Sequence, residues 1–151
     1  SYMEKLQSTG CYQVDEVTLK AIQETFSAGY LDDNATKKCI HDIYQQDNYV
    51  ADTHTAVAWQ VAQDYQKSTQ DKTPMVVLST ASPYKFSDSV LSALGEDISD
   101  KDEFALLDKL STLNKDKIPQ GLAQLQSLPI LHNNLCAKED MIKAVNTFLN
   151  I

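Results

Sequence analysis

The sequence contains no arginine: all 13 basic residues are lysines, and 21 acidic residues bring the formal net charge to -8. A chain of this charge lacks the basic surface that attracts nucleic acid or an anionic membrane, so neither is expected as a partner. Arginine is also the side chain that clamps phosphate or carboxylate through two parallel hydrogen bonds. An anion site in this chain would therefore depend on lysine, hydroxyl groups or backbone N–H groups at a helix start.

Cysteine and long apolar runs are scarce as well. The three cysteines, Cys11, Cys39 and Cys136, are far apart in the sequence and form no C-x-x-C pair. This spacing predicts neither a disulfide framework nor a metal site, and it favours a reducing, cytoplasmic location. Since no apolar run approaches about 20 residues, no transmembrane helix is expected, and no secretion leader is expected either.

Glycine is also rare. The four glycines are isolated from one another, so the sequence contains no Gly-rich loop that could hold a phosphate group through its backbone N–H groups. The remaining composition is ordinary for a globular chain, with 42% hydrophobic and 23% charged residues. A length of 151 residues corresponds to one domain and suffices for a sizeable core.

Most of the sequence predicts helices, because apolar residues recur with the spacing of one helical face. Asp52 or Thr53 is a predicted N-cap, Gly95 is a predicted helix end, and Asp100 with Glu103 resembles a capping box. The predicted helices cover residues 15–28, 35–46, 53–67, 86–94, 101–113, a short stretch after Pro119, and 138–150.

One segment has a different pattern. Residues 74–78 form a continuous, β-branched apolar run opened by proline, which predicts a buried strand of a parallel sheet at about 74–80. A single strand cannot bury both of its faces without neighbouring strands. Two short segments, residues 12–14 and the chain around residue 130, are candidates for pairing with it. The expected fold class is therefore α/β, predominantly helical, in a fragment of a larger protein. A mostly helical domain with one small sheet is the alternative.

The predicted strand ends at Ser79 and Thr80 and is followed by a turn and a helix. In open parallel sheets, ligands bind beyond the carboxyl ends of the strands, where these two hydroxyl groups would lie. From the residues alone, however, an ordinary turn that uses Ser82 and Pro83 for its local geometry is favoured over a binding site.

Two sequence blocks resemble a known family. Residues 79–86, STASPYKF, are similar to the STAHPAKF block of threonine synthases, and residues 52–58, DTHTAVA, resemble their DPHTA block. The resemblance covers nearly the whole chain. The chain departs from the family's pattern at three positions: Ser82 replaces a histidine, Tyr84 a small residue and Thr53 a proline.

This resemblance implies a pyridoxal-phosphate (PLP) enzyme of fold type II, like the tryptophan synthase β subunit. Threonine synthases convert O-phosphohomoserine and water into threonine and phosphate in threonine biosynthesis. They need a lysine that binds the cofactor aldehyde and a Gly-rich phosphate loop, and neither stands in this chain. Residues 1–151 are therefore expected to be a single C-terminal fragment whose missing N-terminal part is its partner, and the fragment alone is expected to bind no PLP, to be inactive and to self-associate.

The resemblance also implies site residues. Thr80, with Ser79 beside it, is the candidate contact to the pyridine nitrogen of PLP, and no catalytic residue is assigned within the chain. His54 and Lys85 are weaker candidates for the substrate site, because His54 could instead fix a helix start and most lysines are simply solvated. Two other functions stay open: a threonine-synthase-like phospho-lyase, and a non-catalytic interaction module that retains the fold.

Overall fold

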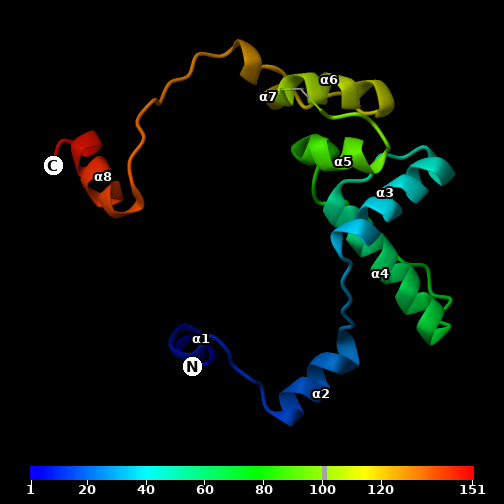
Figure 1. Cartoon of the computed structure of the whole chain (residues 1–151). Helices are drawn as coiled ribbons and strands as arrows, with labels where there is room; N and C mark the ends of the chain where they lie inside the picture. Colours follow the sequence, from blue (N-terminus) through cyan, green and yellow to red (C-terminus); the bar gives the residue numbers. More distant parts are fainter. Residues whose placement is uncertain (100–101) are drawn as a thin grey trace. The chain divides into compact units, whose positions relative to one another are not determined.

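The structure, a computed structural model, describes residues 1–99 and 102–151, and within these ranges it is built from helices without a strand (Figure 1). None of the described helices is long and apolar enough to cross a membrane. The chain divides into two compact units, Ser1–Ile118 and Pro119–Ile151. The α-helices are α1 (Tyr2–Thr9), α2 (Glu16–Thr25), α3 (Asp33–Asp47), α4 (Thr53–Thr69), α5 (Ser87–Ala93), α6 (Glu103–Leu113), α7 (Gln120–Ala123) and α8 (Met141–Leu149), and the 3-10 helices are η1 (Pro83–Phe86), η2 (Leu125–Ser127) and η3 (Lys138–Asp140).

The core of the first unit lies between α3, α4, α5 and α6. Helix α5 contacts both α3 and α6, and α3 also packs against α4. Ile40 of α3, Val90 and Leu91 of α5, and Leu110 of α6 are fully buried. These residues lie on the apolar faces that the sequence predicts for 35–46, 86–94 and 101–113, so the helical pattern is confirmed where it forms the core.

Aspartates begin three of these helices. The carboxylates of Asp32, Asp52 and Asp102 accept backbone hydrogen bonds at the first turns of α3, α4 and α6. An N-cap oxygen satisfies N–H groups that have no partner within the helix. The predicted cap at Asp52 is confirmed. The predicted capping pair of Asp100 with Glu103 involves a residue outside the described ranges, and the described cap of α6 is Asp102.

Helix α5 ends as predicted at a glycine. Gly95 has a φ of 81°, and the N–H group of Glu96 donates to the carbonyl of Leu91 over 3.0 Å. This left-handed geometry favours glycine because a Cβ atom is strained there.

The buried parallel strand predicted at 74–80 is not confirmed. The segment is extended, but within the described residues it has no strand to pair with, and Val76 and Leu78 are 85% and 71% exposed. The other predicted pairing segments, 12–14 and 130, form no strand either. A strand requires hydrogen bonds to a neighbour, so the apolar run alone was an insufficient signal.

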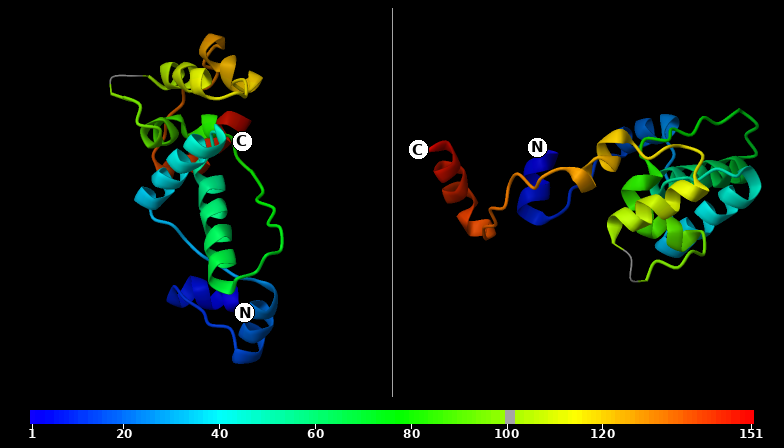
Figure 2. Two further views of the ribbon diagram at one scale, coloured as in Figure 1. Left: turned by 90° about the vertical axis from the view of Figure 1, so that its right-hand side faces the viewer. Right: turned by 90° about the horizontal axis from the view of Figure 1, so that it is seen from above.

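The extended form of this segment has another cause in the described chain. After α4 the chain returns along the helix to its N-terminal end, where Ser79 reaches Thr55 (Figure 2). The helix covers roughly 21 Å from Thr55 to Thr69 at its usual rise, and the ten steps from Thr69 to Ser79 reach at most about 33 Å. Since ten helical steps would advance only about 15 Å, the return segment must be more extended than a helix, with or without a neighbouring strand.

Helix α2 forms within the range predicted at 15–28 but ends earlier, at Thr25 with Phe26 as its C-cap. The apolar residues Val17, Ile22 and Phe26 of its predicted face are exposed. The periodicity therefore predicts the helix correctly, whereas the burial expected for its apolar face is absent from the described chain.

The second unit, Pro119–Ile151, has no fully buried residue. Its last helix, α8, confirms the helix predicted over 138–150. The apolar side chains of α8 are more than half exposed, namely Met141, Ile142, Val145, Phe148 and Leu149. This unit consequently has secondary structure without a core of its own.

Candidate functional site

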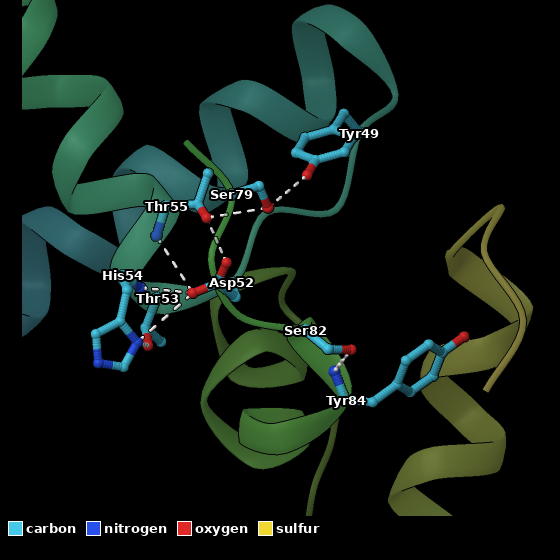
Figure 3. Close-up of polar contacts among 8 residues, drawn as sticks. All are labelled: Tyr49, Asp52, Thr53, His54, Thr55, Ser79, Ser82 and Tyr84. Atoms are coloured by element: carbon cyan, nitrogen blue, oxygen red, sulfur yellow. Dashed lines mark hydrogen bonds and ion pairs between the residues drawn. The ribbon is translucent and has the colours of Figure 1, made fainter. Parts of the chain in front are cut away.

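A buried carboxylate lies at the start of α4 (Figure 3). The Asp52 side chain has no exposed surface. Its Oδ1 atom accepts hydrogen bonds from the backbone N–H groups of His54, at 2.9 Å, and Thr55, at 3.2 Å, and its Oδ2 atom accepts one from the Thr55 hydroxyl. Burying a carboxylate is costly unless hydrogen bonds replace its water. These three donors make Asp52 the fixed end of a polar cluster.

Ser79 joins this cluster from the return segment. Its hydroxyl oxygen lies 3.2 Å from the hydroxyl oxygen of Thr55 and 3.2 Å from that of Tyr49 (Figure 3). Ser79, predicted as a site residue, thus contacts both the first turn of α4 and the loop that precedes it. Tyr49 carries no motif signal in the sequence, since it lies outside both family blocks, and only the fold brings it to Ser79.

Thr80, the predicted contact to a cofactor, follows directly and is exposed. None of the residues that the structure describes forms a hydrogen bond with its side chain, so its hydroxyl group is available to another molecule. The structure therefore separates two neighbouring hydroxyl groups, one bonded within the protein and one free.

His54 lies at the edge of the cluster. Its Nδ1 atom is 3.5 Å from Asp52 Oδ1 and 3.3 Å from Thr53 Oγ1, and its side chain is 66% exposed (Figure 3). The imidazole ring is 5.1 Å from the ring of Phe86, between centroids. The fold thus brings His54 of one family block against Phe86 of the other.

Lys85, the second weaker candidate, is exposed, and its Nζ atom lies 6.0 Å from the centroid of the Phe86 ring. This distance is at the limit of a cation–π contact. His54 and Lys85 therefore both lie near the ring of Phe86.

Two of the residues that depart from the family blocks have structural roles. The Ser82 hydroxyl caps η1 by accepting a hydrogen bond from the N–H group of Tyr84 over 3.3 Å. The Tyr84 ring is buried, and burial raises the pKa of its hydroxyl group. That hydroxyl donates to the backbone carbonyl of Asp116 over 2.6 Å. The block at 79–86 is thereby connected to the chain that follows α6.

Among the residues that the structure describes, no other cluster combines a buried carboxylate with hydroxyl groups from separate segments. A pocket of about 390 Å³ between α3 and α4 is lined mainly by polar side chains and by Trp59. In the ranges 1–99 and 102–151, no group of three His, Cys, Asp or Glu residues is placed to hold a metal ion. The polar cluster around Asp52 and Ser79 is the candidate site.

The family follows from comparison with known proteins. Residues 55–145 match the family described as threonine synthase, C-terminal. The chain belongs to the threonine synthase family. The resemblance predicted from the blocks at 52–58 and 79–86 is thus confirmed.

The chain is similar to several longer proteins. It is 34% identical over 134 residues to threonine synthase-like 1 of Macaca fascicularis, and the aligned region covers 87% of this chain and 16% of that protein. It is 30% identical over 137 residues to threonine synthase of Saccharomyces cerevisiae, and the aligned region covers 85% of this chain and 24% of that protein. The chain therefore spans less than a quarter of the length of these two relatives.

A solved structure has a similar fold. PLP-bound threonine synthase from Brucella melitensis superposes on 98% of this chain and on 27% of its own chain, with a TM-score of 0.66 and 28% sequence identity. The helical arrangement described above is thus found within a larger threonine synthase.

Proposed function

We propose that this chain is the C-terminal portion of a longer threonine synthase that converts O-phosphohomoserine and water into threonine and phosphate. The observation that carries the proposal is the free hydroxyl group of Thr80, placed beside the anchored Ser79 within the family block. The similarity to yeast threonine synthase and to the PLP-bound bacterial enzyme supports it.

One donor in this chain, the Thr80 hydroxyl, has the chemistry that the pyridine edge of PLP needs. When bound, PLP withdraws electrons from the substrate and so makes chemistry at its side chain possible. The Thr80 hydroxyl can donate to the pyridine nitrogen, and a neutral donor leaves that nitrogen largely unprotonated. The resulting weaker electron withdrawal suits elimination and replacement at the substrate side chain.

The remaining contacts to PLP belong, in this proposal, to the N-terminal part of the same protein. Gly10, Gly29, Gly95 and Gly121 are isolated, so none of them contributes to a Gly-rich phosphate cradle. The chain alone should therefore bind no PLP and make no threonine. The exposed apolar face of α8 should cause the isolated chain to self-associate, which sedimentation would detect as species larger than a monomer.

His54 and Lys85 are proposed to face the substrate. The chain has no arginine, so a lysine ammonium group is the cation available here for a substrate phosphate. The nearness of both side chains to the Phe86 ring supports this assignment.

Thr80→Val in the complete protein tests the proposal, because it removes the free hydroxyl group and keeps the size of the side chain. We expect about tenfold weaker PLP binding, as for the loss of one hydrogen bond, together with slower turnover of O-phosphohomoserine. Thr112→Val is the control, since the Thr112 hydroxyl bonds only to the Lys109 carbonyl on the exposed face of α6. Unchanged binding and turnover in Thr80→Val would contradict the proposal.

A phospho-lyase is the second candidate, because relatives named threonine synthase-like 1 are among the most similar. Such an enzyme would release phosphate from O-phosphohomoserine without forming threonine. Product analysis separates the two: threonine and phosphate in equal amounts support the synthase, and phosphate without threonine supports the lyase.

A further inference from the structure

Helix α8 (Met141–Leu149) carries its apolar and polar residues on different faces. Consecutive residues of an α-helix are about 100° apart around its axis, so its large apolar side chains fall within about one third of the circumference. These side chains are Met141, Ile142, Val145, Phe148 and Leu149. Lys143, the charged residue of the helix, and Thr147 lie on the opposite face. An uninterrupted apolar face of this kind is typical of a helix that covers a hydrophobic surface.

No part of the described chain covers this face. Ile142 and Phe148 are 76% and 70% exposed, and the helix packs mainly against η3, directly before it in the sequence. The extended chain that leads to η3 also exposes large apolar side chains, with Ile130 at 80% and Leu135 at 98%. The second unit therefore has an apolar surface that its own residues leave open to solvent.

The length of α8 requires a partner surface. The helix has nine residues, and isolated helices shorter than about 12–15 residues are only marginally stable in water. Most of the stability of such a helix comes from packing of its apolar face against another part of a protein. Since the second unit has no buried residue, that packing has to come from outside it.

A second copy of the chain is a poor partner for α8 alone. Nine residues form a helix about 14 Å long and about 10 Å wide, so two facing helices cover on the order of 300 Å² in total. A stable interface between separate molecules buries about 1,200–2,000 Å². Two copies joined by α8 alone would consequently separate readily.

The remaining part of the same protein is the better partner. A surface on the same chain is held at a high effective concentration, so a small apolar face is enough to dock on it. The PLP-bound bacterial threonine synthase superposes on 98% of this chain, yet the match covers 27% of that longer protein. The family match over residues 55–145 extends into α8, so this helix belongs to the region that the family shares.

We propose that the apolar face of α8 docks on an uncharged apolar surface of the N-terminal part of the same protein and fastens the end of the chain there. The inference rests on one half of the proposed function, namely that this chain is the C-terminal portion of a longer protein. It is independent of the contact between Thr80 and PLP. Lys143 and Thr147 then remain on the solvent side of the docked helix.

The test measures amide hydrogen exchange of α8 in the complete protein by mass spectrometry. A docked α8 should exchange about a hundredfold or more slowly than an unstructured peptide, whereas an undocked nine-residue helix gives little protection. Val145→Asp places a carboxylate at the centre of the apolar face and should speed exchange about tenfold or more, because a buried unpaired charge is costly. Exchange of the unaltered protein at the rate of an unstructured peptide would overturn the inference.

The matched control is Thr147→Asp. It also replaces a β-branched side chain of α8 by aspartate, but on the opposite face, where the Thr147 hydroxyl bonds only to the Lys143 carbonyl of the same helix. Exchange in this variant should stay within about threefold of the unaltered protein, as for a charge at an exposed helix end. Equal acceleration in the two aspartate variants would mean that they act on the helix itself, and it would overturn the inference.

Dilution separates the N-terminal part of the same protein from a second copy. Docking within one chain gives the same exchange rate after about tenfold dilution, whereas protection by a second copy declines as the copies separate. Protection that declines on dilution would overturn the inference. Val145→Ala keeps the test decisive if Val145→Asp does not fold, since it removes apolar contact without adding a charge: exchange as slow as in the unaltered protein would also overturn it.

The exchange measurement is separate from the assay of the proposed function. A complete protein that binds PLP and forms threonine but leaves α8 unprotected contradicts the docking and leaves the proposed function standing. A complete protein that protects α8 but neither binds PLP nor uses O-phosphohomoserine contradicts the proposed function and supports the docking.

Discussion

The Tyr84 hydroxyl donates a 2.6 Å hydrogen bond to the backbone carbonyl of Asp116, across 32 residues of sequence. The ring that carries this hydroxyl is buried, and the Tyr84 carbonyl accepts a further hydrogen bond from the Ser87 hydroxyl over 3.0 Å. Tyr84 stands where threonine synthases have a small residue. The additional ring therefore connects the block that contains Ser79 and Thr80 with the end of α6.

Tyr84→Phe should lower the free energy of unfolding by about 1 kcal/mol, because it removes one hydrogen bond and leaves the ring in place. Urea denaturation of the purified protein measures the change. The control is Tyr30→Phe, since the Tyr30 side chain is 88% exposed. A loss in the control as large as that in Tyr84→Phe would show that the bond to Asp116 contributes nothing.

Asp52→Ala should lower the free energy of unfolding by about 2–3 kcal/mol, more than the loss of an ordinary helix cap. The change removes the N-cap of α4 and also leaves the buried Thr55 hydroxyl without its acceptor. Thermal unfolding gives the comparison.

Asp32→Ala is the matched control for that change, because Asp32 caps α3 by accepting from the N–H group of Ala35 over 2.8 Å at an exposed position. Its expected cost is about 1 kcal/mol. Equal losses in the two alanine variants would mean that Asp52 acts only as a cap and that its bond with Thr55 adds no stability.

Gly29→Ala should destabilise the first unit by about 1–3 kcal/mol through overpacking. A Cβ atom at Gly29 would lie 2.8 and 2.9 Å from the two methyl groups of Val61, and the β-branched valine has little freedom to move away. The double variant Gly29→Ala/Val61→Ala should recover part of the loss.

The control for the glycine change is Gly121→Ala in α7, where a Cβ atom would meet nothing within 4 Å. Because alanine is the better helix former, this change should be neutral or stabilise by up to about 1 kcal/mol. If Gly29→Ala leaves the free energy of unfolding unchanged, α4 and the chain before α3 can move apart more readily than the short distances to Val61 indicate.

The free energy of unfolding should decline as the pH rises above about 9. Burial raises the pKa of the Cys39 thiol from 9.0 and the pKa of the Tyr84 hydroxyl from 10.0. The unfolded chain therefore loses these protons at a lower pH than the folded chain, and folding is disfavoured once the pH exceeds the unfolded values. Cys39→Ala should flatten the decline that begins near pH 9, and Tyr84→Phe the decline that begins near pH 10. Unfolding curves at pH 7 to 11 measure both slopes, and identical slopes in all variants would contradict the assignment.

The sequence predicts the helices well because their signals are local. The apolar spacing around Ile40 and Leu91, the cap at Asp52 and the left-handed end at Gly95 each depend on residues within a few positions of one another. The same periodicity does not predict burial for α2 or α8, because burial depends on the surface that a helix meets.

The strand at 74–80 and the contacts of Ser79 depend on residues far away in the sequence. Pairing of a strand requires a neighbour that this chain does not supply in its described ranges, so the apolar run around Val77 was misleading. Ser79 stays a predicted cofactor contact, and its observed partners Thr55 and Tyr49 lie 24 and 30 residues earlier. No local pattern identifies such a contact.

The return of the chain along α4 limits how far that segment can be shortened without loss of the contact between Ser79 and Thr55. The ten steps from Thr69 to Ser79 exceed the roughly 21 Å that they must cover by about 12 Å at full extension. Deleting about four residues before Met75 would use up this excess length and draw Ser79 away from Thr55, whereas added residues would form a loop at little cost. Among relatives of this chain, deletions in this segment should be far rarer than insertions. The minimum number of residues is set by the length of α4, whereas the maximum is set only by the entropy of closing a longer loop.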